Sequence, residues 1–314
     1  MIFLAGSMLM IWRLESMNAS GMEGTVLGTL VMPYCSGLGN LVFAYVLGKS
    51  GGNSREVMTN CLVNNVTNMT LLIGLPAAIW GMSLAVKKKA APAKKGKTTA
   101  DPQRVNRLSL LLTLTAAAFF TGVTWALGRD GRIDFADGLV LVGVFVFWQV
   151  IHVFEVLKTN AQKNHFGFMF FIDVALLIAG AYAVYVSTDW LVTWVQSLHT
   201  GFISAKHLGW LSGWLMVLPN ALLAFYYAWQ KQPEVVYSSQ VGDGHICIPL
   251  CIGVFALFRP IPVPDFFQLG VWLLVGAAAL HFIFVSVFGS LPRVIGWLLV
   301  AAYGVFIWKG LGIR

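Results

Sequence analysis

Polar side chains that could hold an ion stand inside stretches of the chain that are otherwise apolar. Asn64 and Asn68 are four residues apart, so on a helix they share one face. Asn40 precedes Asn64 by 24 positions, and Asn220 precedes Asp243 by 23. Amide and carboxylate oxygens are ligands for hard cations, and buried in apolar surroundings they need partners or water. Two interpretations stay open: hydrogen bonds between helices, or neutral oxygen ligands along a pathway.

These residues belong to two stretches, 38–74 and 218–253, that look like edited copies of each other. Each begins with Leu-x-Asn and continues through an apolar segment, a short polar loop and a second apolar segment that carries polar residues. The pattern is typical of two membrane helices with polar groups at mid-depth. Two such copies indicate a transporter built from repeats around a site at the membrane midplane.

The composition predicts that membrane helices make up the whole chain. Hydrophobic residues are 58% and charged residues 11%, against roughly 45–50% and 25% in soluble domains. A span needs about 20 apolar residues. We expect an all-α integral membrane protein with about ten transmembrane helices and no removable signal peptide. The predicted spans are 2–18, 24–48, 57–86, 107–127, 137–157, 167–198, 207–230, 239–258, 267–289 and 292–309.

Basic residues predict the orientation. With the amino terminus outside, 13 of the 21 Lys and Arg residues fall on the inner side, eight of them between residues 86 and 108. The positive-inside rule then places both termini outside. The stretch 87–106 is expected to be a basic cytoplasmic linker. Because this topology accounts for the net charge of +8, the charge does not indicate a nucleic-acid partner.

Four cysteines lie within predicted spans, which argues against the disulfide framework of a secreted protein. Cys35, Cys247 and Cys251 together with Asp243 are candidate ligands for a soft metal such as Zn²⁺ or Cu⁺. Cys247 and Cys251 share a helix face, whereas His245 points about 160° away from Cys247 and from Asp243. The other interpretation is that the cysteines are small, buried packing residues.

Other polar residues in the spans have local explanations. Asp173 is either functional or reaches toward the inner membrane surface. His281 is expected to be a core residue bonded to a backbone carbonyl. His152 and Glu155 are one helical turn apart and are expected to form an interfacial pair.

Four short motifs resemble those of the sodium/calcium exchanger-like membrane proteins, the cation/calcium antiporter superfamily. The family's first motif, Gly-Thr-Ser-x-Pro-Glu, matches residues 35–40 (CSGLGN) and 215–220 (LMVLPN). Its second motif, Gly-Ser-Asn-x-x-Asn or Asp, matches 63–68 (VNNVTN) and 242–247 (GDGHIC). The resemblance implies two inverted five-helix repeats, 1–157 and 158–314. It also implies a central ion site or pathway lined by Ser36, Asn40, Asn64, Asn68, Asn220, Asp243 and Cys247.

The departures from the family motifs predict an altered site. Asn40 and Asn220 stand where the family has the glutamates that supply carboxylates, and Asp243 stands where it has Ser. Of the hydroxyl pair only Ser36 remains, and Cys247 does not fit the pattern. Calcium takes six to eight oxygen ligands, usually with several carboxylates. One carboxylate with neutral amides is better suited to Na⁺ or H⁺.

The function that the resemblance implies is therefore cation antiport coupled to Na⁺ or H⁺. The alternative is a transport-inactive relative that serves as a structural membrane subunit of a larger complex. An enzyme is not expected, because no nucleophile, paired carboxylates or metal-motif spacing is present. We expect no cofactor beyond a transported cation. The expected partners are the lipid bilayer, inorganic cations and, for the alternative, other membrane subunits, in a bacterial inner membrane.

Overall fold

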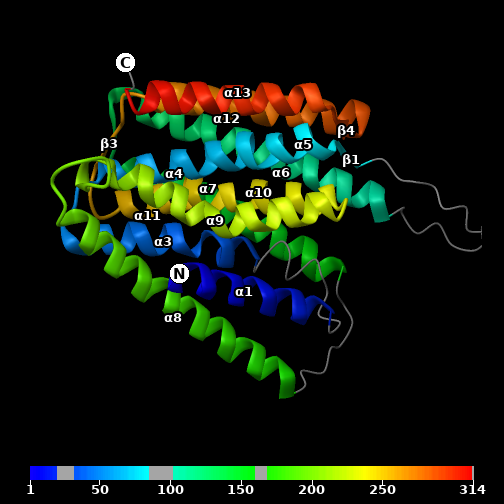
Figure 1. The fold of residues 1–314 in the computed structure, drawn as a ribbon, viewed down its shortest axis with the longest axis horizontal. Coiled ribbons are helices and arrows are strands. Elements are labelled where there is room, and N and C mark those ends of the chain that lie inside the picture. The colour runs from blue at the N-terminus through cyan, green and yellow to red at the C-terminus, as the bar shows by residue number, and fades with distance from the viewer. Residues whose placement is uncertain (20–31, 85–101, 160–167, 313–314) are drawn as a thin grey trace, which may run out of the picture.

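Helices make up nearly all of the computed structural model, which describes residues 1–19, 32–84, 102–159 and 168–312. Most helices run along the long axis of the molecule, and α8 is inclined to it (Figure 1). The α-helices are α1 (Ile2–Ala19), α3 (Met32–Ser50), α4 (Arg55–Val66), α5 (Ile73–Trp80), α6 (Pro102–Leu127), α7 (Phe135–Thr159), α8 (Phe168–Gln196), α9 (Leu208–Trp229), α10 (Pro233–His245), α11 (Ile252–Ala256), α12 (Phe267–Ile283) and α13 (Arg293–Gly310).

Several of these helices are long and apolar enough to cross a membrane. Among the described residues there are six such stretches, and two shorter helices, Ile2–Arg13 and Phe135–Ile151, are apolar as well. The six are Arg55–Trp80, Arg107–Asp130, Phe171–Gln196, Ala205–Trp229, Phe267–Phe288 and Arg293–Gly310. Large apolar side chains such as Phe147 and Val294 are exposed on the outside of the bundle. This is the surface of an integral, multi-pass membrane protein, as the composition predicts.

The helix formed by α4, η2 (Thr67–Leu72) and α5 lies at the centre of the bundle. In the most apolar part of Arg55–Trp80, 83% of the residues are buried, against 22% for Phe171–Gln196. A helix with amides in its middle cannot face lipid, because hydrocarbon offers those amides no hydrogen bonds. Its central position therefore follows from its sequence. A second helix, formed by α10, η5 (Ile246–Cys251) and α11, packs beside it.

Both central helices widen into a π-helical turn at the same place in the two stretches. The turns are η2, directly after α4, and η5, directly after α10. A π-helical turn releases backbone groups from the regular hydrogen-bond pattern and is frequent at functional sites. Pro76 follows η2 and Pro249 lies within η5, and each lacks the N–H that a regular helix would use.

Two short antiparallel ladders join connections that are far apart in the sequence. Strand β1 (Met82–Ser83) pairs with β4 (Ser290–Leu291), and β2 (Arg132–Ile133) pairs with β3 (Ile261–Pro262). The two ladders lie at opposite ends of the bundle, with β1 and β4 on the right and β3 on the left in Figure 1. Each ladder ties a turn in the first half of the chain to a turn in the second.

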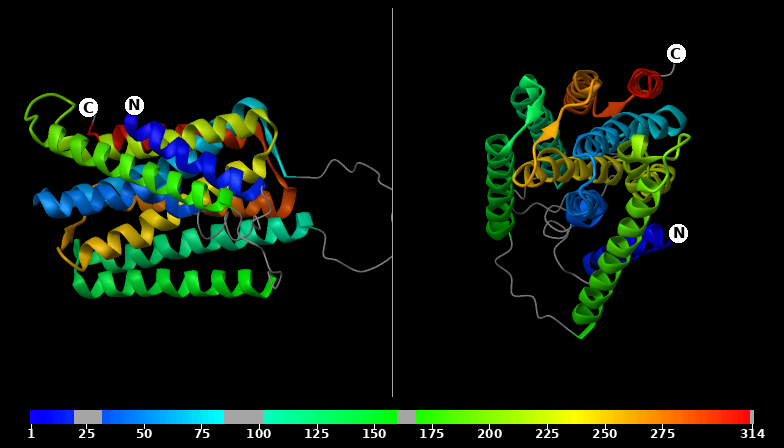
Figure 2. Two further views of the ribbon diagram at one scale, coloured as in Figure 1. Left: turned by 90° about the horizontal axis from the view of Figure 1, so that it is seen from below. Right: turned by 90° about the vertical axis from the view of Figure 1, so that its left-hand side faces the viewer.

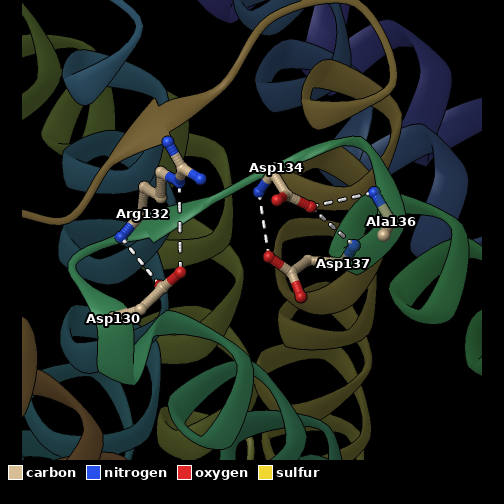
Figure 3. Close-up of polar contacts among 5 residues, drawn as sticks. All are labelled: Asp130, Arg132, Asp134, Ala136 and Asp137. Carbon is tan, nitrogen blue, oxygen red and sulfur yellow. Dashed lines mark hydrogen bonds and ion pairs between the residues drawn. The ribbon is translucent and has the colours of Figure 1, made fainter.

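The turn between α6 and α7 is held by its aspartates (Figure 3). Asp134 Oδ1 accepts hydrogen bonds from Ala136 N at 2.9 Å and from Asp137 N at 3.3 Å, and Asp137 Oδ2 accepts one from Asp134 N at 2.9 Å. This reciprocal arrangement is a capping box, which satisfies free N–H groups in the first turn of α7. Asp130 accepts a hydrogen bond from Arg132 N at 3.2 Å. This turn separates the fourth and fifth predicted spans, 107–127 and 137–157.

Some predicted boundaries are wrong by several residues. The helix α6 begins at Pro102, so the predicted linker 87–106 overlaps its first turn, and residues 85–101 lie outside the described ranges. The helix α10 begins at Pro233 instead of 239, because proline is well suited to the first turn of a helix. The third predicted span, 57–86, ends as helix at Trp80, where Gly81 adopts a positive φ of 70°. The start of the span predicted at 24–48 also lies outside the described residues.

Candidate functional site

Four buried side chains form a continuous chain of hydrogen bonds between the two stretches. Asn64 Nδ2 donates to Asn40 Oδ1 at 3.4 Å. Asn68 Nδ2 donates to Asn64 Oδ1 at 3.0 Å and also to Asp243 Oδ2 at 2.8 Å. None of the four side chains is more than 1% exposed. The amides of the first stretch therefore meet the carboxylate of the second inside the bundle.

The positions of these side chains follow from three helices. Asn64 is in α4 and Asn68 is four residues later in η2, so their amides stack along one face. Asn40 comes from α3 and Asp243 from α10, both of which pack against this central helix. Asn68 belongs to a π-helical turn, which places its amide within reach of Asp243 on the neighbouring helix.

The chemistry of this cluster is that of one carboxyl group among neutral amides. Among the described residues, Asn68 Oδ1 and Asn40 Nδ2 have no hydrogen-bond partner. Asn68 Oδ1 is therefore a free neutral acceptor beside the carboxylate that Asn68 Nδ2 contacts. A buried carboxylate is stabilised by donors, by a cation or by taking up a proton. A single carboxylate can balance one positive charge.

Asn220 lies apart from this chain of hydrogen bonds. Its backbone carbonyl accepts a hydrogen bond from Gln240 Nε2 at 3.3 Å, and the same Nε2 contacts Ser239 Oγ at 3.0 Å. In the described part of the chain, both polar side-chain atoms of Asn220 and Gln240 Oε1 lack partners although the two side chains are fully buried. Gln240 was not predicted as a site residue, although it opens the polar segment that contains Asp243.

Nearer the start of α4, the same polar face contacts α9 closely. Asn60 Nδ2 donates to Ser212 Oγ at 3.0 Å, and Glu56 Oε2 accepts a hydrogen bond from Gly209 N at 2.7 Å. Glu56 therefore caps the amino terminus of α9, where a carboxylate is favourable. A Cβ at Gly213 would lie 2.8 Å from Val63 Cβ. Small residues at 209, 212 and 213 thus let the two helices approach closely.

We expect Gly213→Ala to destabilise the protein by about 1–3 kcal/mol, because the added Cβ has no room against α4 and the two helices must separate. The matched control is Gly276→Ala in the middle of α12, where nothing lies within 4 Å of the added Cβ. There the substitution should be neutral or stabilising by up to about 1 kcal/mol. Thermal unfolding in detergent measures both, and an equal Tm for the two variants would contradict the close contact.

The soft-metal hypothesis stays a prediction that the described residues do not support. No group of three or more His, Cys, Asp or Glu side chains among the described residues could hold a metal ion. Cys247 and Cys251 both contact the thiol of Cys61 on α4, and Cys35 is not part of this contact. Packing between α4 and η5 decides this partner, and the sequence gives no sign of it. The three thiols are completely buried.

The remaining predicted polar residues have structural partners or lie outside the described side chains. Asp173 forms an ion pair with Arg13 at 3.3 Å. His281 Nε2 lies 2.8 Å from the carbonyl oxygen of Met69, which confirms the predicted core histidine. His245 Nε2 lies 3.1 Å from the carbonyl oxygen of Thr113. The side chains of Ser36, His152 and Glu155 are not among those that the structure describes.

A family model described as sodium/calcium exchanger protein matches residues 1–154 and 172–309. The chain belongs to the sodium/calcium exchanger family. This confirms the resemblance that the four motifs indicate, and it identifies the chain as a membrane transport protein of the antiporter type. No curated protein matches the exchanger chain in sequence.

Solved structures of the sodium-calcium exchanger NCX_Mj share the fold of this exchanger-family chain. The structure soaked with 2.5 mM Na⁺ and 10 mM Sr²⁺ has a TM-score of 0.65 at 19% identity, covering 98% of this chain and 94% of NCX_Mj. The one soaked with 10 mM Na⁺ and no Ca²⁺ also has a TM-score of 0.65 at 19% identity, covering 100% and 95%. The one soaked with 2.5 mM Na⁺ and 0.1 mM Ca²⁺ has a TM-score of 0.64 at 20% identity.

Proposed function

We propose that this chain is an antiporter that exchanges a monovalent cation, Na⁺ or H⁺, through an altered central site whose charged member is Asp243. The observation that carries the proposal is the 2.8 Å hydrogen bond between Asn68 Nδ2 and Asp243 Oδ2. It joins the two polar stretches at a fully buried point. A carboxylate inside a membrane protein is costly and is usually retained for function.

The charge balance favours a monovalent ion over calcium. A divalent ion at this depth needs compensating negative charge, and Asp243 is the carboxylate of the cluster. Asn40 and Asn220 provide amides where the family has glutamates. Asn68 Oδ1 is an unpartnered oxygen in the same cluster. It can act as a neutral ligand for a Na⁺ ion bound to Asp243, or as an acceptor for a proton carried by Asp243. Asn64, Asn220, Ser36 and Cys247 are proposed to line the route on either side.

The proposed framework is ten transmembrane helices in two inverted repeats, residues 1–157 and 158–314. Corresponding features support it. The π-helical turns η2 and η5 follow equivalent helices. Each ladder pairs the connection after the third helix of one repeat with the connection after the fourth helix of the other repeat. The symmetry that relates the two repeats would therefore superpose the ladder β1–β4 on the ladder β2–β3. A pseudo-two-fold axis in the membrane plane relates inverted repeats and would produce this pairing.

We propose that both termini lie outside and that the basic stretch 87–106 faces the cytoplasm of a bacterial cell. The start of α1 and the end of α13 lie at the same end of the bundle in two views (Figures 1 and 2). The ladder β1–β4, next to the basic stretch, lies at the other end. The positive-inside rule then gives the orientation.

Ion flux in proteoliposomes tests the proposal. Vesicles that hold the purified chain are loaded with Na⁺, H⁺ or K⁺ gradients and offered Na⁺, Ca²⁺, Mn²⁺ or Zn²⁺ outside. We expect flux that depends on a Na⁺ or H⁺ gradient, and vesicles without protein are the control. If folded protein produces no flux for any pair of ions, the proposal fails, and the chain is instead a structural membrane subunit whose partners are then sought by co-purification.

A further inference from the structure

A buried histidine connects the two central helices through hydrogen bonds of its own. His281 is on α12, which packs against η2. Its Nε2 lies 2.8 Å from the carbonyl oxygen of Met69 in η2, and its Nδ1 lies 3.3 Å from the hydroxyl oxygen of Tyr237 on α10. The side chains of His281 and Tyr237 are completely buried. This histidine therefore bridges the π-helical turn of the first stretch and the helix that carries Asp243.

The two partners fix the orientation of the imidazole ring. A carbonyl oxygen can only accept a hydrogen bond, so His281 Nε2 carries a hydrogen and donates to the carbonyl of Met69. In the neutral ring Nδ1 is then an acceptor, and the hydroxyl of Tyr237 donates to it. The two rings also meet edge to face, with centroids 5.4 Å apart and an interplanar angle of 84°. Tyr237 thus holds the ring so that Nε2 points at η2.

The carbonyl that His281 contacts belongs to the turn on which the polar cluster depends. Met69 directly follows Asn68, whose amide donates to Asp243 at 2.8 Å. A π-helical turn is rare compared with a regular α-helical turn, so a hydrogen bond from another helix to one of its carbonyls helps to retain it. Side chains point in different directions in the two kinds of turn. A change of η2 to a regular turn would therefore move the amide of Asn68 relative to Asp243.

We propose that His281 is a positioning residue for cation exchange, which holds η2 in its π-helical form so that Asn68 reaches Asp243. This inference rests on the proposed function and adds to it a residue from outside the two polar stretches. The ring nitrogens of His281 contact Met69 and Tyr237 rather than the cluster. The histidine therefore acts through the backbone of η2 and does not bind the ion itself.

The variants His281→Gln and His281→Met separate this role from packing. The two new side chains have similar length, and the amide nitrogen of glutamine is as many bonds from Cα as Nε2 of histidine. Glutamine can therefore still donate to the carbonyl of Met69, whereas methionine cannot. In proteoliposomes, His281→Met should raise KM for the coupling ion about tenfold with a smaller change in the maximal rate. His281→Gln should stay within about twofold of the wild type.

A double-mutant cycle tests whether His281 acts through Asn68. Asn68→Ala removes the amide and should itself raise KM. If His281 positions that amide, adding His281→Met to Asn68→Ala should raise KM no further, whereas a merely structural role would give independent effects that multiply. Tyr237→Phe should fall between the wild type and His281→Met, because the ring then loses one of the two bonds that orient it.

Amide hydrogen exchange follows the turn itself and does not depend on transport. The peptide that contains residues 67–72 should exchange faster in His281→Met than in the wild type, because a turn that loses a hydrogen bond opens more often. In His281→Gln the rate should be close to that of the wild type. Asp173→Asn is the control for a general loss of stability, and it should change neither this rate nor KM.

The outcomes distinguish this inference from the proposed function. If the wild type exchanges cations and both His281 variants share its KM, the positioning role is wrong and the proposed function stands. Multiplying effects in the double variant would lead to the same conclusion. If the folded wild type exchanges no cation, the proposed function fails and the positioning role fails with it. Should His281→Met not fold, Tyr237→Phe takes its place, and a wild-type KM in that variant would overturn the inference.

Discussion

Asp243→Asn is expected to abolish cation exchange while leaving the protein folded. Asp243 is fully buried and accepts a hydrogen bond from Asn68, which an asparagine oxygen can also accept. The variant therefore keeps the packing and one hydrogen bond but loses the negative charge. Removing one partner of a buried charge pair costs about 3–5 kcal/mol. Cation affinity should fall at least about 100-fold, since each 1.4 kcal/mol is a factor of ten.

The measurement is flux in proteoliposomes, with thermal unfolding to show that the variant is folded. Asp173→Asn is the comparison, because Asp173 is also a carboxylate within a candidate span but pairs with Arg13 away from the cluster. It should reduce stability and keep exchange. Wild-type flux in Asp243→Asn, or loss of flux in Asp173→Asn alone, would move the charged centre away from Asp243.

The double variant Asn40→Glu/Asn220→Glu is expected to gain calcium transport, which the monovalent-cation site proposed for the wild type should not support. Both positions correspond to carboxylates in the family motifs, and both side chains are buried. With Asp243 the variant has three carboxylates, which approaches the charge that calcium sites usually contain. Unpaired buried carboxylates are costly, so the variant should be less stable without an ion and should be restored by calcium.

Radiolabelled calcium uptake and the Tm with and without calcium measure this gain. At a calcium concentration of 100 times Kd, binding should stabilise the folded state by about 2.7 kcal/mol. Asn40→Gln/Asn220→Gln is the control, because it adds the same side-chain length without charge and should show neither effect. A folded glutamate variant that neither takes up calcium nor is stabilised by it would show that the two positions do not share an ion with Asp243.

The sequence alone determined the class of the protein, the approximate place of its helices and the residues of the polar cluster. Apolar runs and a spacing of four residues are local properties, so they indicate membrane helices and the shared face of Asn64 and Asn68 without knowledge of the packing. The two copied stretches also indicated the exchanger family. Helix ends were less predictable, as at α6 and α10, because single residues such as prolines set them.

Only the tertiary structure decided which of these residues meet. Asn68 and Asp243 are 175 positions apart, and their contact depends on how the two central helices pack and on the π-helical turn η2. The same packing brings Cys61 into contact with Cys247 and Cys251. It also separates the side chain of Asn220 from the chain of hydrogen bonds. Motifs specify residue types along one helix. The distance between side chains on two helices depends on every residue at their interface, including glycines such as Gly213 that no ion-site pattern would select.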